Sequence, residues 1–206
     1  MRVRLLILDT VLCYLLGSIN GAYTLVKLLF DKDIRDYGSG NPGSTNVYRV
    51  FGLNKALVSF AFDTLKGFFA IKLSDLILPG DPLARALAAL AVVAGHDFSF
   101  LLGHNGGKGV ATSFGIGLAL TPGLTCCGAA LSAVLLIMTR LMSLSNMISM
   151  GVLAAATFIL RYPTYISVLY TILFIAACVR HKSNIQRLLN GTENKIEFPH
   201  LPHKDK

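Results

Sequence analysis

One lysine surrounded by glycines is the residue of this chain best suited to binding an anion. Lys108 lies in residues 103–109, with the sequence G-H-N-G-G-K-G, and an apolar run begins at Val110. Glycines let neighbouring backbone N–H groups converge on an anion, and a helix starting at Val110 would add the positive end of its dipole. The segment predicts a phosphate cradle, with a plain glycine-rich turn between membrane helices as the alternative. The candidate ligands are Gly106, Gly107, Lys108, Gly109 and Thr112.

This segment does not match the P-loop of nucleotide-binding proteins. The P-loop has a glycine five residues before its second glycine and a Ser or Thr after its lysine. Here Leu102 and Gly109 occupy those positions, so the hydroxyl that would hold magnesium is missing. We therefore expect a phosphate site without a nucleotide cofactor or a metal ion.

A second polar segment, residues 38–46, is equally rich in hydrogen-bond donors. Its sequence, G-S-G-N-P-G-S-T-N, contains glycines, hydroxyls and amides but no acid, and Arg49 follows it. Donors without carboxylates suit a phosphate or an oxyanion. The alternative is a capped loop that leads into a helix, although a cap needs only one or two such residues.

The third polar segment, residues 180–195, predicts a short helix. His181, Asn184 and Arg187 are spaced by three, so they would share one face. Gly191 would end the helix. A basic amphipathic helix on anionic lipid is the simpler interpretation of these residues alone, and a substrate-binding helix is the other.

Composition indicates an integral membrane protein with one domain over residues 1–206. The chain is 53% hydrophobic and only 15% charged, whereas soluble domains carry about 25% charged residues. The net charge of +8 predicts positive cytoplasmic loops, and then anionic lipid or anionic substrates as partners. Nucleic acid is excluded as a partner because the charges are scattered through short loops. Four cysteines in apolar runs are expected to be small core residues: Cys13, Cys126, Cys127 and Cys178.

The apolar runs predict an all-α bundle of seven transmembrane helices. The run after Lys108 is divided at Pro122-Gly123 because Lys108 and Arg140 are both expected on the cytoplasmic side. Its first arm would be about 16 Å long, short of a hydrocarbon core of roughly 30 Å, so this short helix would end inside the bundle. Positive residues at 32–55, 108, 140 and 180–206 place the N-terminus outside and the C-terminus inside. The expected spans are residues 5–29, 53–78, 83–102, 110–121, 123–139, 146–160 and 164–179.

Charged residues inside the predicted spans are expected to pair, because isolated charges in a bilayer are costly. Asp63 and Lys66, one helical turn apart, predict a structural ion pair behind the site. Lys72 and Asp75 predict a similar pair one turn further along.

Two other ionisable residues have a structural and a functional interpretation. His96 is expected to be a core histidine bonded to a backbone carbonyl, and a proton-accepting role is the alternative. Glu193 is expected to pair with Arg49 or Arg187 and to order the C-terminal segment, rather than to act on substrate.

Three segments together resemble the PlsY family of bacterial acyl-phosphate:glycerol-3-phosphate acyltransferases. The resemblance rests on residues 38–46, 106–112 and 180–193, in order and with compatible spacing, and on the shorter matches D-x-x-K-G at 63–67 and G-H at 95–96. It extends over residues 10–195. Among the departures, Asn20 stands where proline is common, Ser44 replaces alanine, and His104-Asn105 replace Phe-Lys.

The resemblance implies a reaction in which a hydroxyl of sn-glycerol 3-phosphate attacks the carbonyl of acyl phosphate. The products would be lysophosphatidic acid and inorganic phosphate, in the first step of membrane phospholipid synthesis. It implies a multi-pass protein of the bacterial inner membrane with a cytoplasmic active site, and an enzyme that makes acyl phosphate as a partner. It implies neither a cofactor nor a metal.

The resemblance also assigns roles to individual residues. The catalytic set is Ser39, Lys108, His181 and Asn184. The phosphate-binding set is Gly38, Gly40, Asn41, Gly43, Thr45, Asn46, Arg49, Gly106, Gly107, Gly109, Thr112, Ser143 and Ser145. The orienting set is Asp63, Lys66, His96, Arg187 and Glu193.

The proton acceptor and the class of function each have an alternative. The hydroxyl proton can pass to His181, to His96 or to the departing phosphate, whose second pKa is about 6. We favour the phosphate, with His181 as a positioning donor. Other acyltransferases use a His-x4-Asp dyad, and no aspartate follows His96, His104 or His181 at that spacing. A small anion or phosphate transporter or channel is the other function considered. The one-sided distribution of donor-rich loops and the lack of an internal inverted repeat count against it.

Overall fold

The structure, a computed structural model, describes residues 1–197; residues 198–206, the end of the predicted domain and of its basic tail, lie outside the described part. Within residues 1–197 every regular element is a helix. Short 3-10 turns at Ile34–Asp36 and Phe100–Leu102 accompany the α-helices. The α-helices are α1 (Arg2–Ser18), α2 (Gly21–Phe30), α3 (Ser44–Phe51), α4 (Leu53–Ile77), α5 (Pro82–Asp97), α6 (Val110–Leu120), α7 (Pro122–Thr139), α8 (Met142–Ile159), α9 (Thr164–Arg180) and α10 (Lys182–Leu189).

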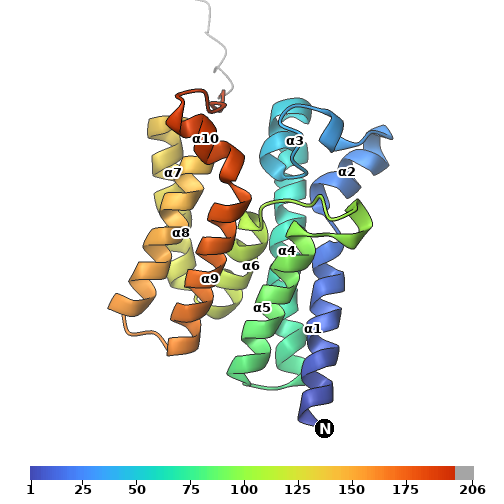
Figure 1. Ribbon diagram of the computed structural model, residues 1–206, viewed down its shortest axis with the longest axis vertical. Helices are drawn as coiled ribbons and strands as arrows, with labels where there is room; N and C mark the ends of the chain where they lie inside the picture. The colour runs from blue at the N-terminus through green and yellow to red at the C-terminus, as the bar shows by residue number, and fades with distance from the viewer. Residues whose placement is uncertain (198–206) are drawn as a thin grey trace, which may run out of the picture.

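The long helices form two groups, which are joined by α6 and by contact between α5 and α9. Helix α1 packs on α5, α4 packs on α6, and α8 lies between α7 and α9 (Figure 1). The short helices α2, α3 and α10 gather at the end of the bundle opposite the N-terminus (Figure 1). The segments 38–46 and 180–195 are therefore near this end, and the loop that carries Lys108 lies deeper, in the same half of the molecule (Figure 1).

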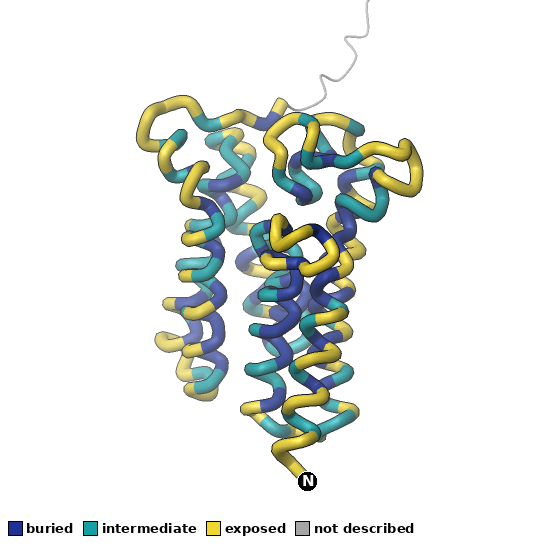
Figure 2. The backbone as a smooth tube through the Cα atoms, turned by 45° about the vertical axis from the view of Figure 1, so that its right-hand side comes forward, coloured by how far each residue is buried: buried dark blue, intermediate teal, exposed yellow. Residues whose placement is uncertain are grey.

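The outward faces of the helices are apolar, as expected for contact with lipid. Exposed residues follow the outer faces and buried residues the inner faces of the long helices (Figure 2). On α7, Ile137 is 68% exposed and Met138 is 77% exposed. Cys126 and Cys127 are also exposed on this helix, so the prediction that they are core residues was wrong.

The number of spans stays a prediction. By length and composition, three of the described helices could cross a membrane, or up to five if each bent pair is one span. Helix α6 has 11 residues and α7 begins directly after it at Pro122, which confirms the division of the long apolar run.

The helices differ from the predicted spans at three places. The span 5–29 is broken into α1 and α2, which meet at 42°, because the Asn20 side chain caps α2 by accepting the Tyr23 N–H at 2.8 Å. In the predicted span 83–102 the α-helix ends at Asp97, but the segment Pro82–Leu102 is long and apolar enough to cross a membrane, so the bounds of this span agree with the prediction. Beyond it the chain folds back, and Gly106 N–H bonds to the Asp97 carbonyl. Helix α8 begins at Met142 rather than at 146.

Close approach of helices depends on glycine at the α1–α5 crossing. A Cβ atom on Gly95 would overlap the Tyr14 carbonyl oxygen of α1. Such contacts between backbones are typical of small residues at membrane helix interfaces. They bring α5, and the loop that follows it, close to the break between α1 and α2.

An ion pair from α4 holds the broken span together. Lys66 Nζ lies 2.8 Å from Asp63 Oδ1, and both side chains are 2% exposed. Lys66 also donates to the Gly17 and Ile19 carbonyls at 3.0 and 2.8 Å, and Asp63 accepts the Gly21 N–H at 3.1 Å. The break frees these backbone groups from helical bonds, so the ion pair satisfies them.

The second predicted ion pair does not form. Asp75 pairs with Arg85 of α5 at 2.7 Å, while Lys72 Nζ lies 5.3 Å from the centre of the Phe68 ring. Asp75 therefore has its partner on α5, whereas Lys72 contacts an aromatic ring of its own helix, α4.

We expect Lys66→Met to destabilise the protein by about 3–5 kcal/mol, because it leaves Asp63 charged and buried without a partner. The effect is measured by heating the protein in detergent and recording how much of its size-exclusion peak remains at each temperature. The control is Arg2→Met, which removes the cation of the exposed Arg2–Asp81 pair; its midpoint should stay near that of the wild type. Equal shifts in the two variants would contradict a structural role for the buried pair.

Candidate active site

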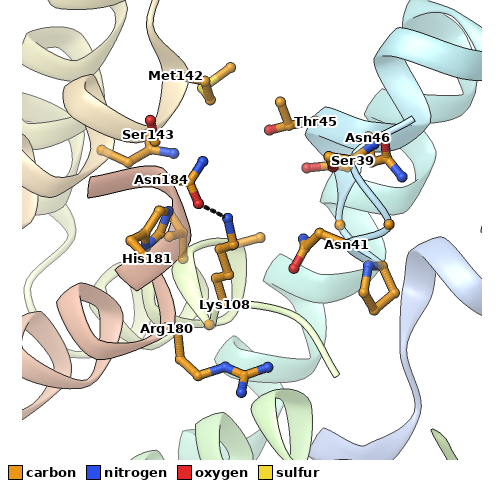
Figure 3. Close-up of a pocket in the computed structure, with 18 of the residues that line it drawn as sticks. Ser39, Asn41, Thr45, Asn46, Lys108, Met142, Ser143, Arg180, His181 and Asn184 are labelled. Carbon is orange, nitrogen blue, oxygen red and sulfur yellow. Dashed lines mark hydrogen bonds between the residues drawn. The ribbon is translucent and has the colours of Figure 1, made fainter. Parts of the chain in front are cut away.

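The donor-rich segments line one cavity of about 470 Å³. Ser39, Asn41 and Thr45 face it from one side, and Lys108, His181 and Asn184 from the other (Figure 3). The predicted residues that line it are Ser39, Gly40, Asn41, Gly43, Thr45, Asn46, Arg49, Asp63, His96, Gly106, Lys108, Gly109, Ser143, His181, Asn184, Arg187 and Glu193. Those outside the lining are Gly38, Lys66, Gly107, Thr112 and Ser145. Of the latter, Ser145 bonds to the Leu141 carbonyl of its own helix at 2.9 Å.

The loop before α3 is folded by Asn46, which is 1% exposed. Its Oδ1 accepts the Ser39 N–H at 2.9 Å, and its Nδ2 donates to the carbonyls of Ile34 and Tyr37 at 3.2 and 2.9 Å. All of these bonds are internal to the loop, so Asn46 shapes the site. Gly43 precedes α3 without a side-chain cap, which leaves the first N–H groups of that helix available to an anion.

The Lys108 loop is held against α5 and α9. Gly107 N–H donates to the His96 carbonyl at 3.0 Å, and a Cβ atom at Gly107 would overlap His96 Nε2. From the other side, Arg180 Nε donates to the Gly107 carbonyl at 3.0 Å. Gly109 has φ of +72° and forms the N-cap of α6, a conformation that strains other residues. The loop is thus fixed before any ligand arrives.

Arg180 lines the cavity, although the sequence reasoning assigned it no role. Its guanidinium also bonds to the Gly106 carbonyl at 3.1 Å and stacks 4.9 Å from the centre of the Phe98 ring. The available signal was its place at the start of the third polar segment. It brings a positive charge to the cavity through contacts that only the tertiary fold creates.

Lys108 is oriented by a network that ends on the only acid of the third segment. Its ammonium donates to Asn184 Oδ1 (Figure 3). Asn184 Nδ2 in turn donates to Glu193 at 2.6 Å, and Ser143 donates to the same oxygen at 2.9 Å. Arg187 pairs with Glu193 at 2.8 Å, which confirms one of the two predicted partners.

The other predicted partner, Arg49, bonds instead to the Asn194 carbonyl at 3.2 Å. It nevertheless lines the cavity together with Arg180 and Arg187. The cavity therefore has an excess of positive charge.

That excess, together with burial, controls the ionisation of Lys108. Burial lowers the pKa of Lys108 to about 8; Glu193 opposes this, while the charges of Arg187, Arg49 and Arg180 add to it. Burial also raises the pKa of Glu193, but hydrogen bonds from Asn184, Ser143 and Arg187 outweigh it and hold that pKa below its usual value. At neutral pH the site therefore offers a charged lysine and a bound carboxylate.

His181, between α9 and α10, is neutral at physiological pH. Burial lowers the pKa of His181 to about 4, and the charge of Lys108 acts in the same direction. Its Nδ1 lies 2.7 Å from the Ala177 carbonyl; because a carbonyl can only accept, Nδ1 carries the proton and Nε2 is an acceptor. The expected role as a positioning donor does not fit this tautomer.

His96 lies behind the glycine loop and is 3% exposed. Its Nδ1 is 2.8 Å from Lys66 Nζ and 3.5 Å from Asp63 Oδ1. The prediction of a core histidine is correct, but its partner is the buried ion pair and not a carbonyl. His96 therefore links that ion pair to the loop that carries Lys108.

An apolar cavity of about 370 Å³ adjoins the polar one. Four residues line both: Phe60, Val110, Met142 and Asn146. Of these, only Asn146 has a polar side chain. Its Oδ1 accepts the Ser132 hydroxyl at 2.9 Å, so its Nδ2 is left to donate at the junction. The sequence reasoning placed Asn146 at the start of a predicted span and did not assign it a role.

Comparisons with known proteins agree on one family. The family model described as glycerol-3-phosphate acyltransferase matches residues 7–191. A glycerol-3-phosphate acyltransferase of Thermoanaerobacter pseudethanolicus is 37% identical over 190 residues, 92% of this chain and 95% of the relative. One from Enterococcus faecalis is 40% identical over 210 residues, 96% of this chain and 94% of the relative.

Solved structures give the same result. The crystal structure of PlsY, an integral membrane glycerol 3-phosphate acyltransferase, in its glycerol 3-phosphate form is 30% identical with a TM-score of 0.87, covering 93% of this chain and 96% of that one. The lysophosphatidic acid form is 28% identical with a TM-score of 0.85, covering 93% and 95%. With a family match over residues 7–191, this chain belongs to the glycerol-3-phosphate acyltransferase family of PlsY.

Proposed function

We propose that the protein transfers an acyl group from acyl phosphate to the 1-hydroxyl of sn-glycerol 3-phosphate, in the first step of bacterial membrane phospholipid synthesis. The observation that carries this proposal is the junction between a cationic cavity of about 470 Å³ and an apolar one of about 370 Å³. Phosphate groups suit the first and an acyl chain suits the second. The acyl carbonyl would then lie between them.

The polar cavity has room for two phosphates on opposing sets of donors. Ser39, Asn41 and Thr45 offer neutral donors on one side, and Lys108 and Arg180 offer charge on the other. Bare phosphates suit such compact donor sets. Glycerol 3-phosphate and lysophosphatidic acid, which name the two similar solved structures, each carry one phosphate.

In the proposed reaction the glycerol hydroxyl attacks the acyl carbonyl, and the bond from the carbonyl carbon to phosphate oxygen breaks. His181 Nε2 accepts a hydrogen bond from the attacking hydroxyl and orients it, and the departing phosphate takes the proton. Asn146 Nδ2 donates to the oxygen on which negative charge develops. Lys108 neutralises phosphate charge, oriented by Asn184.

The proposed setting is the bacterial inner membrane, with seven spans, the N-terminus outside and the active site in the cytoplasm. The supporting observation is that α2, α3 and α10 lie at the end opposite the N-terminus and the Lys108 loop lies in the same half of the molecule (Figure 1). An enzyme that makes acyl phosphate would supply the donor. The same one-sidedness disfavours an anion transporter, which needs access from both ends.

The direct test of this function uses purified protein with glycerol 3-phosphate and palmitoyl phosphate. We expect lysophosphatidic acid and free phosphate in equal amounts, at a rate unaffected by a chelator. Palmitoyl coenzyme A should not replace palmitoyl phosphate, because a nucleotide needs a larger pocket with a stacking surface. Release of phosphate without acylated product, or comparable rates with the two donors, would contradict the proposal.

The ionisation of Lys108 predicts a pH dependence. Because the pKa of Lys108 is lowered to about 8, the free enzyme loses this charge as the pH rises through that value. The KM for glycerol 3-phosphate should stay level below about pH 8 and then rise about tenfold per unit.

Two variants of Lys108 test the origin of this dependence. Lys108→Arg keeps its charge at all these pH values and should flatten the profile. Lys108→Ala should fold but lose about 2–4 kcal/mol of transition-state stabilisation in kcat/KM. An unchanged profile in Lys108→Arg would assign the titration to another group.

Asn146→Ala should lower kcat by roughly a hundredfold, the order observed when an oxyanion donor is removed, with little change in the KM for glycerol 3-phosphate. Asn54→Ala is the control, because Asn54 is exposed at the start of α4 and lines neither cavity. A rise in KM at constant kcat would instead make Asn146 a substrate-binding residue.

A further inference from the structure

The apolar cavity ends at a group of three hydroxyls, which we name the hydroxyl cluster: Thr121, Thr125 and Tyr170. Tyr170 Oη bonds to Thr121 Oγ1 and lies 3.3 Å from Thr125 Oγ1, and the two threonine oxygens are 3.4 Å apart. Their residues are 4%, 2% and 8% exposed in the order named. The three hydroxyls satisfy one another, so the cluster is a closed polar unit in an otherwise apolar region.

The cluster lies at the end of the cavity remote from the phosphate site. Along α6 the lining runs from Val110 at the junction to Gly117, about 10 Å at 1.5 Å per residue. Along α8 it runs from Met142 to Leu153, about 16 Å. Thr121 is the residue between α6 and α7, and Thr125 lies in the first turn of α7. The cavity thus extends along the bundle and stops at this turn.

Glycines set the width of the cavity near the cluster. A Cβ atom on Gly128 would lie 2.5 Å from Leu153 Cδ1, and one on Gly117 would lie 3.0 Å from Tyr170 Oη. The narrow end is therefore already filled to contact distance. An added carbon atom there has to displace a side chain.

An acyl chain that moves from lipid into this cavity exchanges one apolar environment for another. Each additional methylene therefore gains little, in contrast to transfer from water. A chain that is too long loses instead, because it must overpack the narrow end or separate hydrogen-bonded hydroxyls. Discrimination between chains would then come from the closed end of the cavity.

We propose that the hydroxyl cluster sets the longest acyl chain that the enzyme uses, with Tyr170 as the specificity-determining residue. This inference rests on the proposed function, since it takes the apolar cavity as the site of the donor's acyl chain. Activity is level with chain length until the terminal methyl reaches Tyr170. Beyond that length it falls by roughly tenfold, the order expected for forcing extra carbon atoms into a filled site.

The experiment measures kcat/KM for decanoyl, lauroyl, myristoyl, palmitoyl and stearoyl phosphate at saturating glycerol 3-phosphate. Ala129→Leu adds bulk to the cavity wall and should move the fall to shorter chains. Tyr170→Leu removes part of the wall at the end of the cavity and should move the fall in kcat/KM to longer acyl chains. The matched controls lie on the same helices outside the lining: Ala130→Leu beside Ala129, and Tyr165→Leu on α9. Both should keep the wild-type profile.

The outcomes separate this inference from the function on which it rests. Acyl transfer by the wild type with the same profile in Ala129→Leu as in Ala130→Leu would overturn the chain-length role and leave the proposed function standing. If Tyr170→Leu does not fold, the test rests on Ala129→Leu, in which kcat/KM should fall at a shorter chain length than in the wild type. Lack of transfer by the wild type from every acyl phosphate would overturn the proposed function and this inference with it.

Discussion

The Asp63–Lys66 ion pair is the interaction on which the arrangement of the site depends. It lies where the first span breaks, and its hydrogen bonds replace those that the break removes from Gly17, Ile19 and Gly21. A break in a helix surrounded by lipid would otherwise leave backbone groups without partners. The charged residues of α4 therefore allow α2 to turn away, and α2 leads directly into the loop that forms one wall of the cavity.

The same ion pair supports the opposite wall through His96. This residue contacts Lys66 with its side chain and accepts the Gly107 N–H with its carbonyl, so it joins the ion pair to the Lys108 loop. Arg180 holds that loop from α9. Asn184 and Glu193 then orient Lys108 itself. Such preorganisation means that little rearrangement is needed when a phosphate binds.

A polar and an apolar environment adjoin at the junction of the two cavities. Buried cations and free donors make one side suitable for phosphate, while glycines and apolar side chains open the other side to a lipid chain. Among the described residues that line both cavities, Asn146 alone has a polar side chain. A membrane enzyme that joins a water-soluble substrate to an acyl chain needs this boundary, and the break before α2 and the short α6 help to form it.

The sequence by itself determined the helical class, the division of the long apolar run at Pro122, the Asp63–Lys66 pair and most residues of the polar cavity, because periodicity, charge spacing and glycine-rich motifs are local properties. It missed the break between α1 and α2 and the start of α8, and it misassigned the partners of His96 and Asp75 and the exposure of Cys126 and Cys127. It also left Arg180 and Asn146 without roles. The tertiary structure decided the partners, the exposed cysteines and the places of Arg180 and Asn146, because these depend on helices distant in sequence, whereas the break before α2 also involves the local cap of Asn20. The tautomer of His181 was likewise decided by a bond to its own helix, since only geometry reveals which nitrogen is engaged.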